Sequence, residues 1–134
     1  MEAFAHDATV ALPAGADDRA PAGAVTLALC GAWEHEPPCP LAPHHTATTR
    51  DADGTLRLRI LFAAAPADEA EVRRRIDDAL TAGTLDGPDG RTTVWEFRGS
   101  AAADVAAGEA AHAARLVASH GGSTPTDPPP APPP

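Results

Sequence analysis

The sequence contains no lysine and no tyrosine, and few aromatic residues of any kind. All ten basic residues are arginines, and they stand against 19 acidic residues, which gives a net charge of −9. Surfaces that bind nucleic acid are basic and carry aromatic side chains for stacking, yet this chain has only two tryptophans and three phenylalanines. We therefore expect no binding to nucleic acid or to anionic membrane surfaces.

Long hydrophobic runs are also missing. No stretch approaches the ~20 apolar residues of a membrane-spanning helix, and no basic segment precedes the short apolar run near the N-terminus. These absences predict a cytoplasmic protein without a membrane anchor. Large apolar residues are scarce as well, because 32 of the 134 residues are alanine. The chain can therefore form one small core at most.

The larger apolar residues are concentrated in the middle of the chain, which predicts three parts. Residues 1–23 are rich in Ala, Asp, Gly and Pro, and we expect a flexible arm with at most a short edge strand at 9–12. Residues 24–120 are predicted to form a single α+β domain. Residues 121–134 carry seven of the fifteen prolines and are predicted to be a disordered, proline-rich tail.

Hydrophobic spacing predicts six elements within the domain. Alternating apolar residues predict strands over 25–33, 44–50, 55–63 and 92–98. An amphipathic pattern that ends at Gly83 predicts a helix over 66–82, and a second helix is predicted over 101–119 with Ser100 as its cap. The order β-β-β-α-β-α predicts a small four-stranded, mostly antiparallel sheet with both helices on one face.

Only two cysteines are present, Cys30 and Cys39, and without an export signal free thiols or metal ligands are favoured over a disulfide. Cys39 lies in the segment Glu34–His45, which also holds three of the six histidines, two glutamates and four prolines. Thiolate and imidazole together suit Zn²⁺, and a proline-rich loop loses little entropy when its ligands are fixed around an ion. The segment predicts a zinc site; the alternative is a stiff loop with surface histidines and a buried cysteine.

Strand geometry selects among these ligands. Cys30 and His35 are separated by an odd number of residues and are expected to face opposite sides of a strand. A four-residue turn at 51–54 places His45 opposite Ile60 on the inner face and leaves His44 outside. The predicted zinc ligands are therefore His35, Cys39 and His45, with His44, Cys30 and Glu34 as alternates.

The order of a histidine, a cysteine-containing loop and a histidine pair resembles the zinc-and-cysteine segment of the pterin-synthase (tunnelling) fold. The resemblance covers about residues 33 to 50. That family has its two histidines one residue apart, so that both face the metal, whereas His44 and His45 are adjacent. No later Asp-His pair or terminal glutamate matches the family's pattern, so the resemblance does not assign the chain to it.

Three other groups of charged residues are interpreted as surface features or as a weaker binding site. The arginines of 73–75 have acidic residues four positions away and are predicted to pair with them on a solvated helix face. Arg57 and Arg59 are predicted on the outer face of their strand, where they could bind a phosphate or carboxylate or pair with Glu34. Glu109 and His112 have the spacing of a carboxylate-bridged metal helix, but such sites need further carboxylates from several helices.

Two functions remain open from the sequence. The first is a small binding or regulatory module without catalysis of its own, whose partner is a protein or a small anionic ligand; the alanine-lined face of 101–119 is compatible with a homodimer. The second is a zinc-dependent small-molecule lyase or hydrolase on the same three ligands, with Glu34 or Glu36 as general base and Arg59 holding an anionic group. The sequence has no glycine-rich phosphate loop, nucleophile elbow or redox Cys-x-x-Cys, which favours the module.

Overall fold

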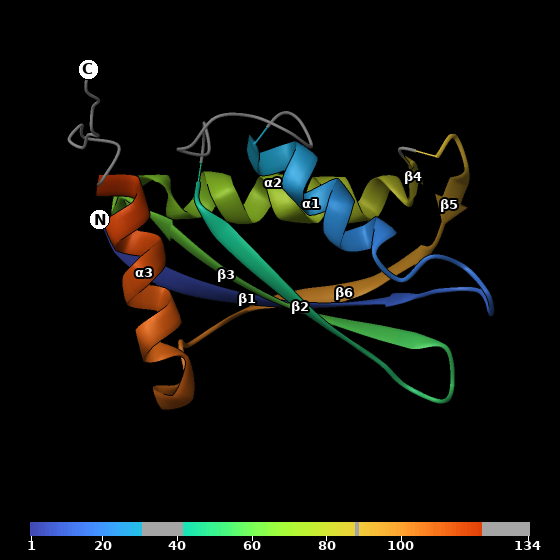
Figure 1. Ribbon diagram of the computed structural model, residues 1–134, viewed down its shortest axis with the longest axis horizontal. Coiled ribbons are helices and arrows are strands. Elements are labelled where there is room, and N and C mark those ends of the chain that lie inside the picture. Colours follow the sequence, from blue (N-terminus) through green and yellow to red (C-terminus); the bar gives the residue numbers. More distant parts are fainter. Residues whose placement is uncertain (31–41, 88, 122–134) are drawn as a thin grey trace, which may run out of the picture.

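The computed structural model describes residues 1–30, 42–87 and 89–121, with the side chains of residues 30 and 119–121 excepted (Figure 1). Helices and strands are mixed, and four of the strands form one antiparallel sheet. The predicted α+β class and the four-stranded antiparallel sheet are therefore confirmed. None of the helices in the described ranges is long and apolar enough to cross a membrane.

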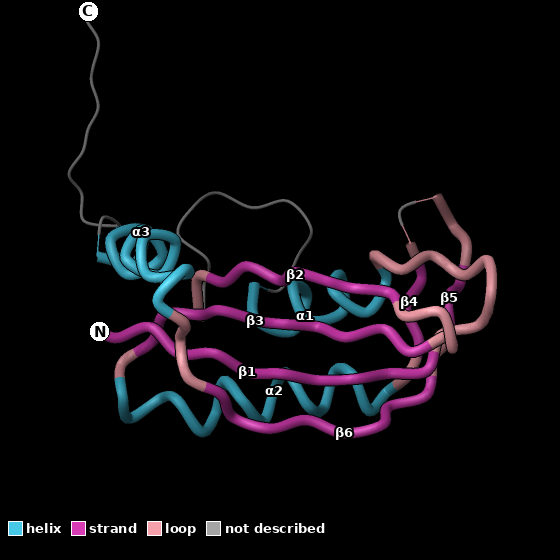
Figure 2. The backbone as a smooth tube through the Cα atoms, turned by 90° about the horizontal axis from the view of Figure 1, so that it is seen from below, coloured by secondary structure: helices cyan, strands magenta, loops and turns pink. Residues whose placement is uncertain are grey.

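The elements in chain order are β1 (Glu2–Ala11), α1 (Ala20–Cys30), β2 (His44–Arg50), β3 (Thr55–Ala64), α2 (Glu69–Ala82), β4 (Thr84–Asp86), β5 (Thr92–Val94), β6 (Glu96–Ala103) and α3 (Ala110–Gly121). Short 3-10 turns at Pro66–Asp68 and Ala107–Glu109 lead into α2 and α3. The strand order in the main sheet is β2-β3-β1-β6, with the four strands side by side in Figure 2. This is the split β-α-β connectivity of ferredoxin-like domains, extended by a β4–β5 hairpin before the last strand and by α3 after it.

Helices α1 and α2 cover one face of the sheet, and α3 lies against the other face near one end (Figure 1). The main core lies between the sheet and the first two helices. It is built from alternate residues of β1 and β3 and from the inner residues of the helices, the largest being Phe62, Leu29, Leu56, Leu58, Ile60, Ile76 and Leu80. The outward row of β3, which carries Arg57 and Arg59, points away from this core, as the alternation predicts.

Helix α2 agrees with its sequence pattern. Acidic residues in its first turn complement the helix dipole, and its buried stripe consists of Val72, Ile76 and Leu80. Gly83 ends the helix in the left-handed conformation, with a φ of 72°. The predicted pairs are also present, because Arg73, Arg74 and Arg75 each contact a carboxylate four residues away. Arg73 does not lie on a solvated face as predicted, since its side chain is only 15% exposed and also donates to the Ala5 carbonyl.

The N-terminal segment corrects the prediction of a flexible arm over 1–23. Residues Glu2–Ala11 form β1, which is a central strand paired with β3 on one side and β6 on the other. Ala5, Ala8 and Val10 of this strand are buried. Alanine occurs at buried and at exposed positions alike, so the alternation of buried and exposed residues that marks a strand is not visible in this segment. Its small side chain nevertheless packs well in a central strand whose two faces are both covered.

The predicted strand over 25–33 is also wrong for its described part, because residues Ala20–Cys30 form helix α1. Val25 and Leu29 are four residues apart, so they fit both the period of a strand and that of a helix. Ala20 and Ala24 complete the buried helical stripe. The helical period is therefore visible only when the buried alanines are included, because the spacing of the larger residues fits both a strand and a helix.

The last part of the described chain differs from prediction in where its elements begin and end. The predicted strand over 92–98 is divided at Trp95 into β5 and β6, and β6 continues to Ala103. Ser100 therefore lies within a strand and donates a hydrogen bond to Asp77 (2.6 Å) instead of capping a helix. The helix begins only at Ala110, and it packs on the face opposite α1 and α2. The prediction that both helices lie on one face of the sheet is therefore wrong, because α2 and α3 lie on opposite faces.

Candidate functional site

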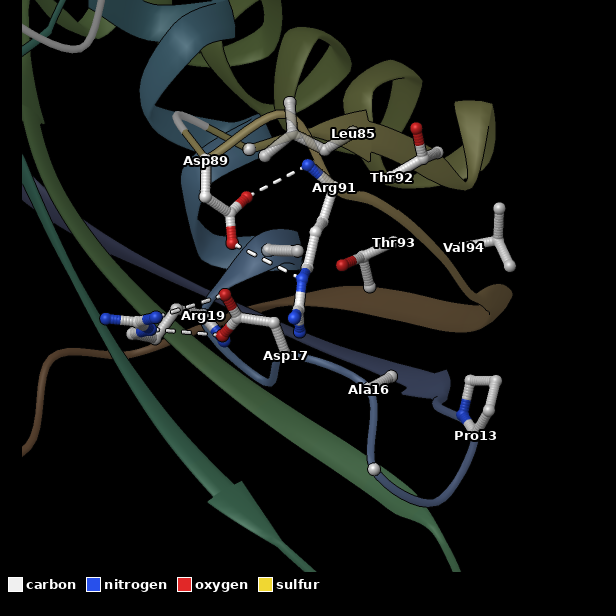
Figure 3. Close-up of a pocket in the computed structure, with 13 residues that line it drawn as sticks. Pro13, Ala16, Asp17, Arg19, Leu85, Asp89, Arg91, Thr92, Thr93 and Val94 are labelled. Atoms are coloured by element: carbon white, nitrogen blue, oxygen red, sulfur yellow. Dashed lines mark hydrogen bonds and ion pairs between the residues drawn. The ribbon is translucent and has the colours of Figure 1, made fainter.

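A pocket lies where the loop between β1 and α1 meets the β4–β5 hairpin (Figure 3). Backbone hydrogen bonds shape both walls. In the hairpin, the Gly87 amide donates to the Arg91 carbonyl (2.7 Å) and the Gly90 amide to the Gly87 carbonyl (3.0 Å). In the loop, the Ala16 amide donates to the Pro13 carbonyl (3.1 Å). Two short turns from distant parts of the sequence therefore form the sides of one cavity of about 610 Å³.

The two walls carry the same local motif. Asp17 and Arg19 on one wall, and Asp89 and Arg91 on the other, are each separated by one residue. In both cases the aspartate carboxylate accepts the backbone amide of the arginine, at 2.9 Å for Arg19 and 3.0 Å for Arg91. Such Asx turns fix the backbone and orient the arginine that follows.

The two arginines differ in how their charges are neutralised. Arg19 makes a bidentate pair with Asp17, with Nε at 3.0 Å and Nη2 at 3.2 Å from the two carboxylate oxygens. Because the Arg19 guanidinium and amide both donate to it, Asp17 has a pKa below its ordinary value and stays ionised. Arg91, by contrast, has its Nε 4.0 Å from Asp89, which is the limit of an ion contact.

Figure 3 shows the Arg91 side chain extending from the hairpin across the pocket toward Asp17. Its side chain is 88% exposed. Three apolar residues, Leu85, Val94 and Pro13, line the same cavity. Val94 is 54% exposed, which is unusual for a large aliphatic side chain in this protein. The lining of the pocket thus contains one loosely paired cation, Arg91, and a small apolar surface.

This lining suits binding. Among the described residues that form the pocket, none is a histidine, cysteine or lysine. The pKa of Asp17 in this lining is lowered by the neighbouring Arg19, which is the opposite of the shift expected for a general acid at neutral pH. The arrangement can hold an anion and exclude part of its surface from water.

Most of the sequence-predicted site falls outside the described residues. His35, Cys39, Glu34 and Glu36 all lie between residues 31 and 41, so the zinc site and the enzyme hypothesis built on it stay predictions. Cys30 is the last residue of α1, and its side chain is not described. Within 1–30, 42–87 and 89–121, no three His, Cys, Asp or Glu side chains are grouped so that they could hold a metal ion.

The register of the β2–β3 hairpin corrects the predicted roles of the two adjacent histidines. The Asp51 amide donates to the Thr55 carbonyl (2.8 Å), so that the loop is one residue shorter than expected. His45 is therefore opposite Leu61, not Ile60, and His44 is the residue on the side of the main core. A shift of one residue exchanges the two faces of a strand.

His44 and His45 consequently have different surroundings. His44 donates from Nδ1 to the Ala42 carbonyl (3.1 Å), and its Nε2 lies 3.0 Å from the hydroxyl of Thr26 on α1. His45 lies on the opposite face, where its ring is 4.5 Å from that of His112 on α3, measured between centroids. Burial, and to a lesser degree the charge of His112, lowers the pKa of His45.

Arg59, predicted to hold an anionic group, is already engaged. Its guanidinium donates to both carboxylate oxygens of Glu109 (3.1 and 2.7 Å), to Asp7 (3.0 Å) and to the Asp104 carbonyl (2.6 Å). Arg57 donates to Asp51 at 3.0 Å. Both arginines are on the outer face as predicted, and their guanidinium groups bind carboxylates of this chain.

The pocket residues were not predicted from the sequence, including Arg91, which supplies the loosely paired positive charge. One signal was present, because the spacing Asp-x-Arg occurs twice in polar segments, at Asp17 and at Asp89. Nothing in the sequence placed these segments side by side, since that depends on β1 lying in the centre of the sheet. Comparison with protein families, with curated proteins and with solved structures found no match to this chain.

Proposed function

We propose that this protein is a non-catalytic binding module that holds a small carboxylate-bearing ligand in the pocket between the β1–α1 loop and the β4–β5 hairpin. The observation that carries the proposal is the position of Arg91, which extends across a cavity of about 610 Å³ with its only ion contact among the described residues at 4.0 Å. A guanidinium binds carboxylate through paired hydrogen bonds, and the N–H donors of Arg91 are available for such a pair with a ligand.

The charges of the pocket favour a ligand with a single negative charge. Asp17 neutralises Arg19 through a bidentate pair, so Arg91 is the remaining attractive charge. Asp89 stands beside it, and the protein as a whole carries a charge of −9. A dianionic phosphate would meet both the local carboxylates and this overall repulsion, whereas a monoanion gains the Arg91 pairing at a lower electrostatic cost.

The apolar groups of the pocket favour a ligand with a short hydrocarbon part. Leu85, Val94 and Pro13 line the same cavity as Arg91, and the exposed Val94 would lose contact with water when a ligand covers it. Burying apolar surface contributes about 25 cal/mol per Å². The ligand class is therefore a small amphiphilic carboxylate, with its charged group on Arg91 and its hydrocarbon on the aliphatic wall.

Calorimetric titration of the full chain with hexanoate tests the proposal. Hexanol has the same hydrocarbon without the charge, and acetate has the charge without most of the hydrocarbon, so both should bind more weakly. Replacement of Arg91 by alanine should weaken hexanoate binding about 10- to 100-fold, the range of a hydrogen bond to a charged group.

Arg98→Ala is the matched control. Arg98 is an exposed arginine on β6 that pairs with Glu96 at 3.2 Å and does not line the pocket. Its removal changes the net charge as Arg91→Ala does, and should leave the affinity within about twofold of wild type, the range of a surface pair. Equal affinities of wild type and Arg91→Ala for hexanoate, or no binding of any of these carboxylates at 10 mM, would contradict the proposal.

A further inference from the structure

Two histidines from separate elements meet on the face of the sheet that α3 covers. His45 is on the edge strand β2 and His112 is on α3, and their ring centroids are 4.5 Å apart with an interplanar angle of 53°. The sequence distance between them is 67 residues, so only the packing of α3 against the sheet brings them together. Their position is distinct from the hairpin pocket, whose lining contains neither residue.

We propose that His45 and His112 bind one divalent transition-metal ion of the zinc class and thereby fasten α3 to the sheet. Imidazole nitrogen is a preferred ligand of Zn²⁺, at about 2.0–2.1 Å, which places two nitrogens of a tetrahedral site roughly 3.3 Å apart. The centres of the two rings lie 4.5 Å apart, so binding of one ion requires the rings to turn until a nitrogen of each faces it. Water occupies the remaining positions of such a two-histidine site.

One ionised carboxylate lies close to His112. Glu109, one turn before His112, is an ionised carboxylate: its pKa is lowered to about 2, first by the Arg59 side chain, then by the Ala106 amide, and to a lesser extent by His112. Its oxygens are occupied by Arg59 and by the Ala106 amide, so it is not a direct ligand. Its negative charge lies close enough to His112 for an electrostatic attraction, and it would attract an ion bound there in the same way.

Helix α3 is the element that gains most from such an ion. Ala113 is its one buried residue among those whose side chains are described, and none of its residues belongs to the main core. Polar contacts therefore carry much of its attachment, namely the Glu109–Arg59 pair just before the helix and the contact of His112 with His45. An ion that binds only the docked helix stabilises docking by mass action.

Zinc titration of the untagged full chain tests the inference, with wild type compared to His45→Gln, His112→Gln and the double variant His35→Ala/Cys39→Ala. The two glutamine variants keep the polar character of each position but remove the imidazole, and each should lose at least tenfold in zinc affinity. The double variant removes the donors predicted from sequence in residues 31–41, and its affinity at the His45–His112 site should match wild type.

Hydrogen exchange gives a second readout that a loop site would not produce. Zinc should slow amide exchange in α3 of the wild type and leave α3 exchange unchanged in His112→Gln. The inference is overturned if His112→Gln binds zinc as tightly as wild type, or if wild type binds no zinc at 100 µM. Loss of all zinc binding in the His35→Ala/Cys39→Ala variant, with full binding in His112→Gln, would place the ion in the segment predicted from sequence.

Discussion

At the scale of single residues, the most heavily bonded side chain on the outer face of the sheet is Arg59. It connects β3 to β1 through Asp7 and to the turn before α3 through Glu109. The Glu109 and Arg59 side chains are each about a quarter exposed, so the pair is partly shielded from solvent. Charge-assisted, bidentate pairs of this kind are stronger than ordinary surface ion pairs.

Replacement of Glu109 by glutamine should reveal a pH-dependent contribution to stability. Because the pairing lowers the pKa of Glu109 from 4.5 to about 2, its stabilisation is present above pH 4.5 and is lost as the pH falls toward 2. We expect the wild type to exceed Glu109→Gln by about 1–2 kcal/mol in free energy of unfolding at pH 7, after allowance for screening at the surface. Urea denaturation at pH 7, 4 and 2.5 measures this difference.

The control for this series is Glu96→Gln, which removes an exposed carboxylate whose partner is Arg98. Its free energy of unfolding should stay within about 0.5 kcal/mol of wild type across the same pH range. A difference between wild type and Glu109→Gln that stays constant down to pH 2.5 would contradict the assignment of the effect to ionisation of Glu109.

At the scale of elements, the helices and strands with large apolar residues at regular spacing were predicted from the sequence. The elements whose buried positions are mostly alanine were not. Strand β3 and helix α2 lie where predicted, because Leu, Ile and Phe alternate with arginine in β3, and Val, Ile and Leu recur with a helical period in α2. Strand β2 has no Leu, Ile, Val or Phe, and its threonines and the turn that follows predicted it instead. In β1 and α1 the spacing is carried mainly by alanines, which are apolar in both exposed and buried positions. The hairpin register also depended on one backbone bond at Asp51, which no side chain reveals.

The candidate site was harder to predict than the fold for the same reason. The predicted ligands His35 and Cys39 lie outside the described residues. His45 lies on the opposite face from the predicted one, because the observed register of β2 differs from the predicted register by one residue. The pocket around Arg91 is built from two segments that resemble ordinary polar loops. Their proximity is a property of the tertiary structure, in which α1 packs against β4.

The junction between α2 and the hairpin depends on Gly83. This residue has a φ of 72°, and a Cβ added there would lie 2.8 Å from the carbonyl oxygen of Trp95. Its own carbonyl accepts the Trp95 amide at 2.9 Å. We expect Gly83→Ala to lower the free energy of unfolding by about 2 kcal/mol, from the left-handed backbone and the close contact together. Thermal and urea denaturation measure the loss.

Gly108→Ala provides the comparison for this prediction. Gly108 is outside the positive-φ region, and a Cβ there would meet nothing within 4 Å. The variant should be neutral or slightly more stable than wild type, because alanine restricts the unfolded chain. Similar losses in both variants would argue against a special role for the Gly83 junction.

The central position of β1 can be tested by truncating its side chains. Val10 is fully buried among residues of β3, α1 and α2, whereas Thr9 points to the other face and is half-buried. Val10→Ala should cost about 2 kcal/mol in free energy of unfolding, and Thr9→Ala no more than about 0.5 kcal/mol. If Val10→Ala were as mild as Thr9→Ala, residues 1–23 would behave as the flexible arm predicted from sequence.

At the scale of the whole molecule, the protein consists of a two-layer core to which α3 is added from the other side. The core cluster joins the sheet to α1 and α2 and contains no described residue of α3. On the face of the sheet opposite α1 and α2, α3 contacts β1 and β3, and Ala113 of α3 is buried together with a small patch of Ala5, Leu61 and Ala63. The two layers should therefore fold without α3, and the pocket should remain, since its lining lies entirely in the N-terminal loop and the hairpin.

A chain that ends at Ala106 tests this arrangement. It should unfold cooperatively with a loss of about 2–4 kcal/mol, from exposure of the patch around Leu61 and removal of the Glu109–Arg59 pair. The near-ultraviolet circular dichroism of buried Trp95 should persist in the shortened chain. Loss of this signal, or a non-cooperative transition, would show that α3 is required for the core to form.

The most direct test of the binding proposal is a map of amide chemical shifts of the isotopically labelled full chain during titration with hexanoate. The proposal predicts a saturable change concentrated in residues 13–20 and 85–94, the two segments that line the pocket around Arg91. Shift changes centred elsewhere, for example along β2 and α3, or no change at 20 mM hexanoate, would contradict it.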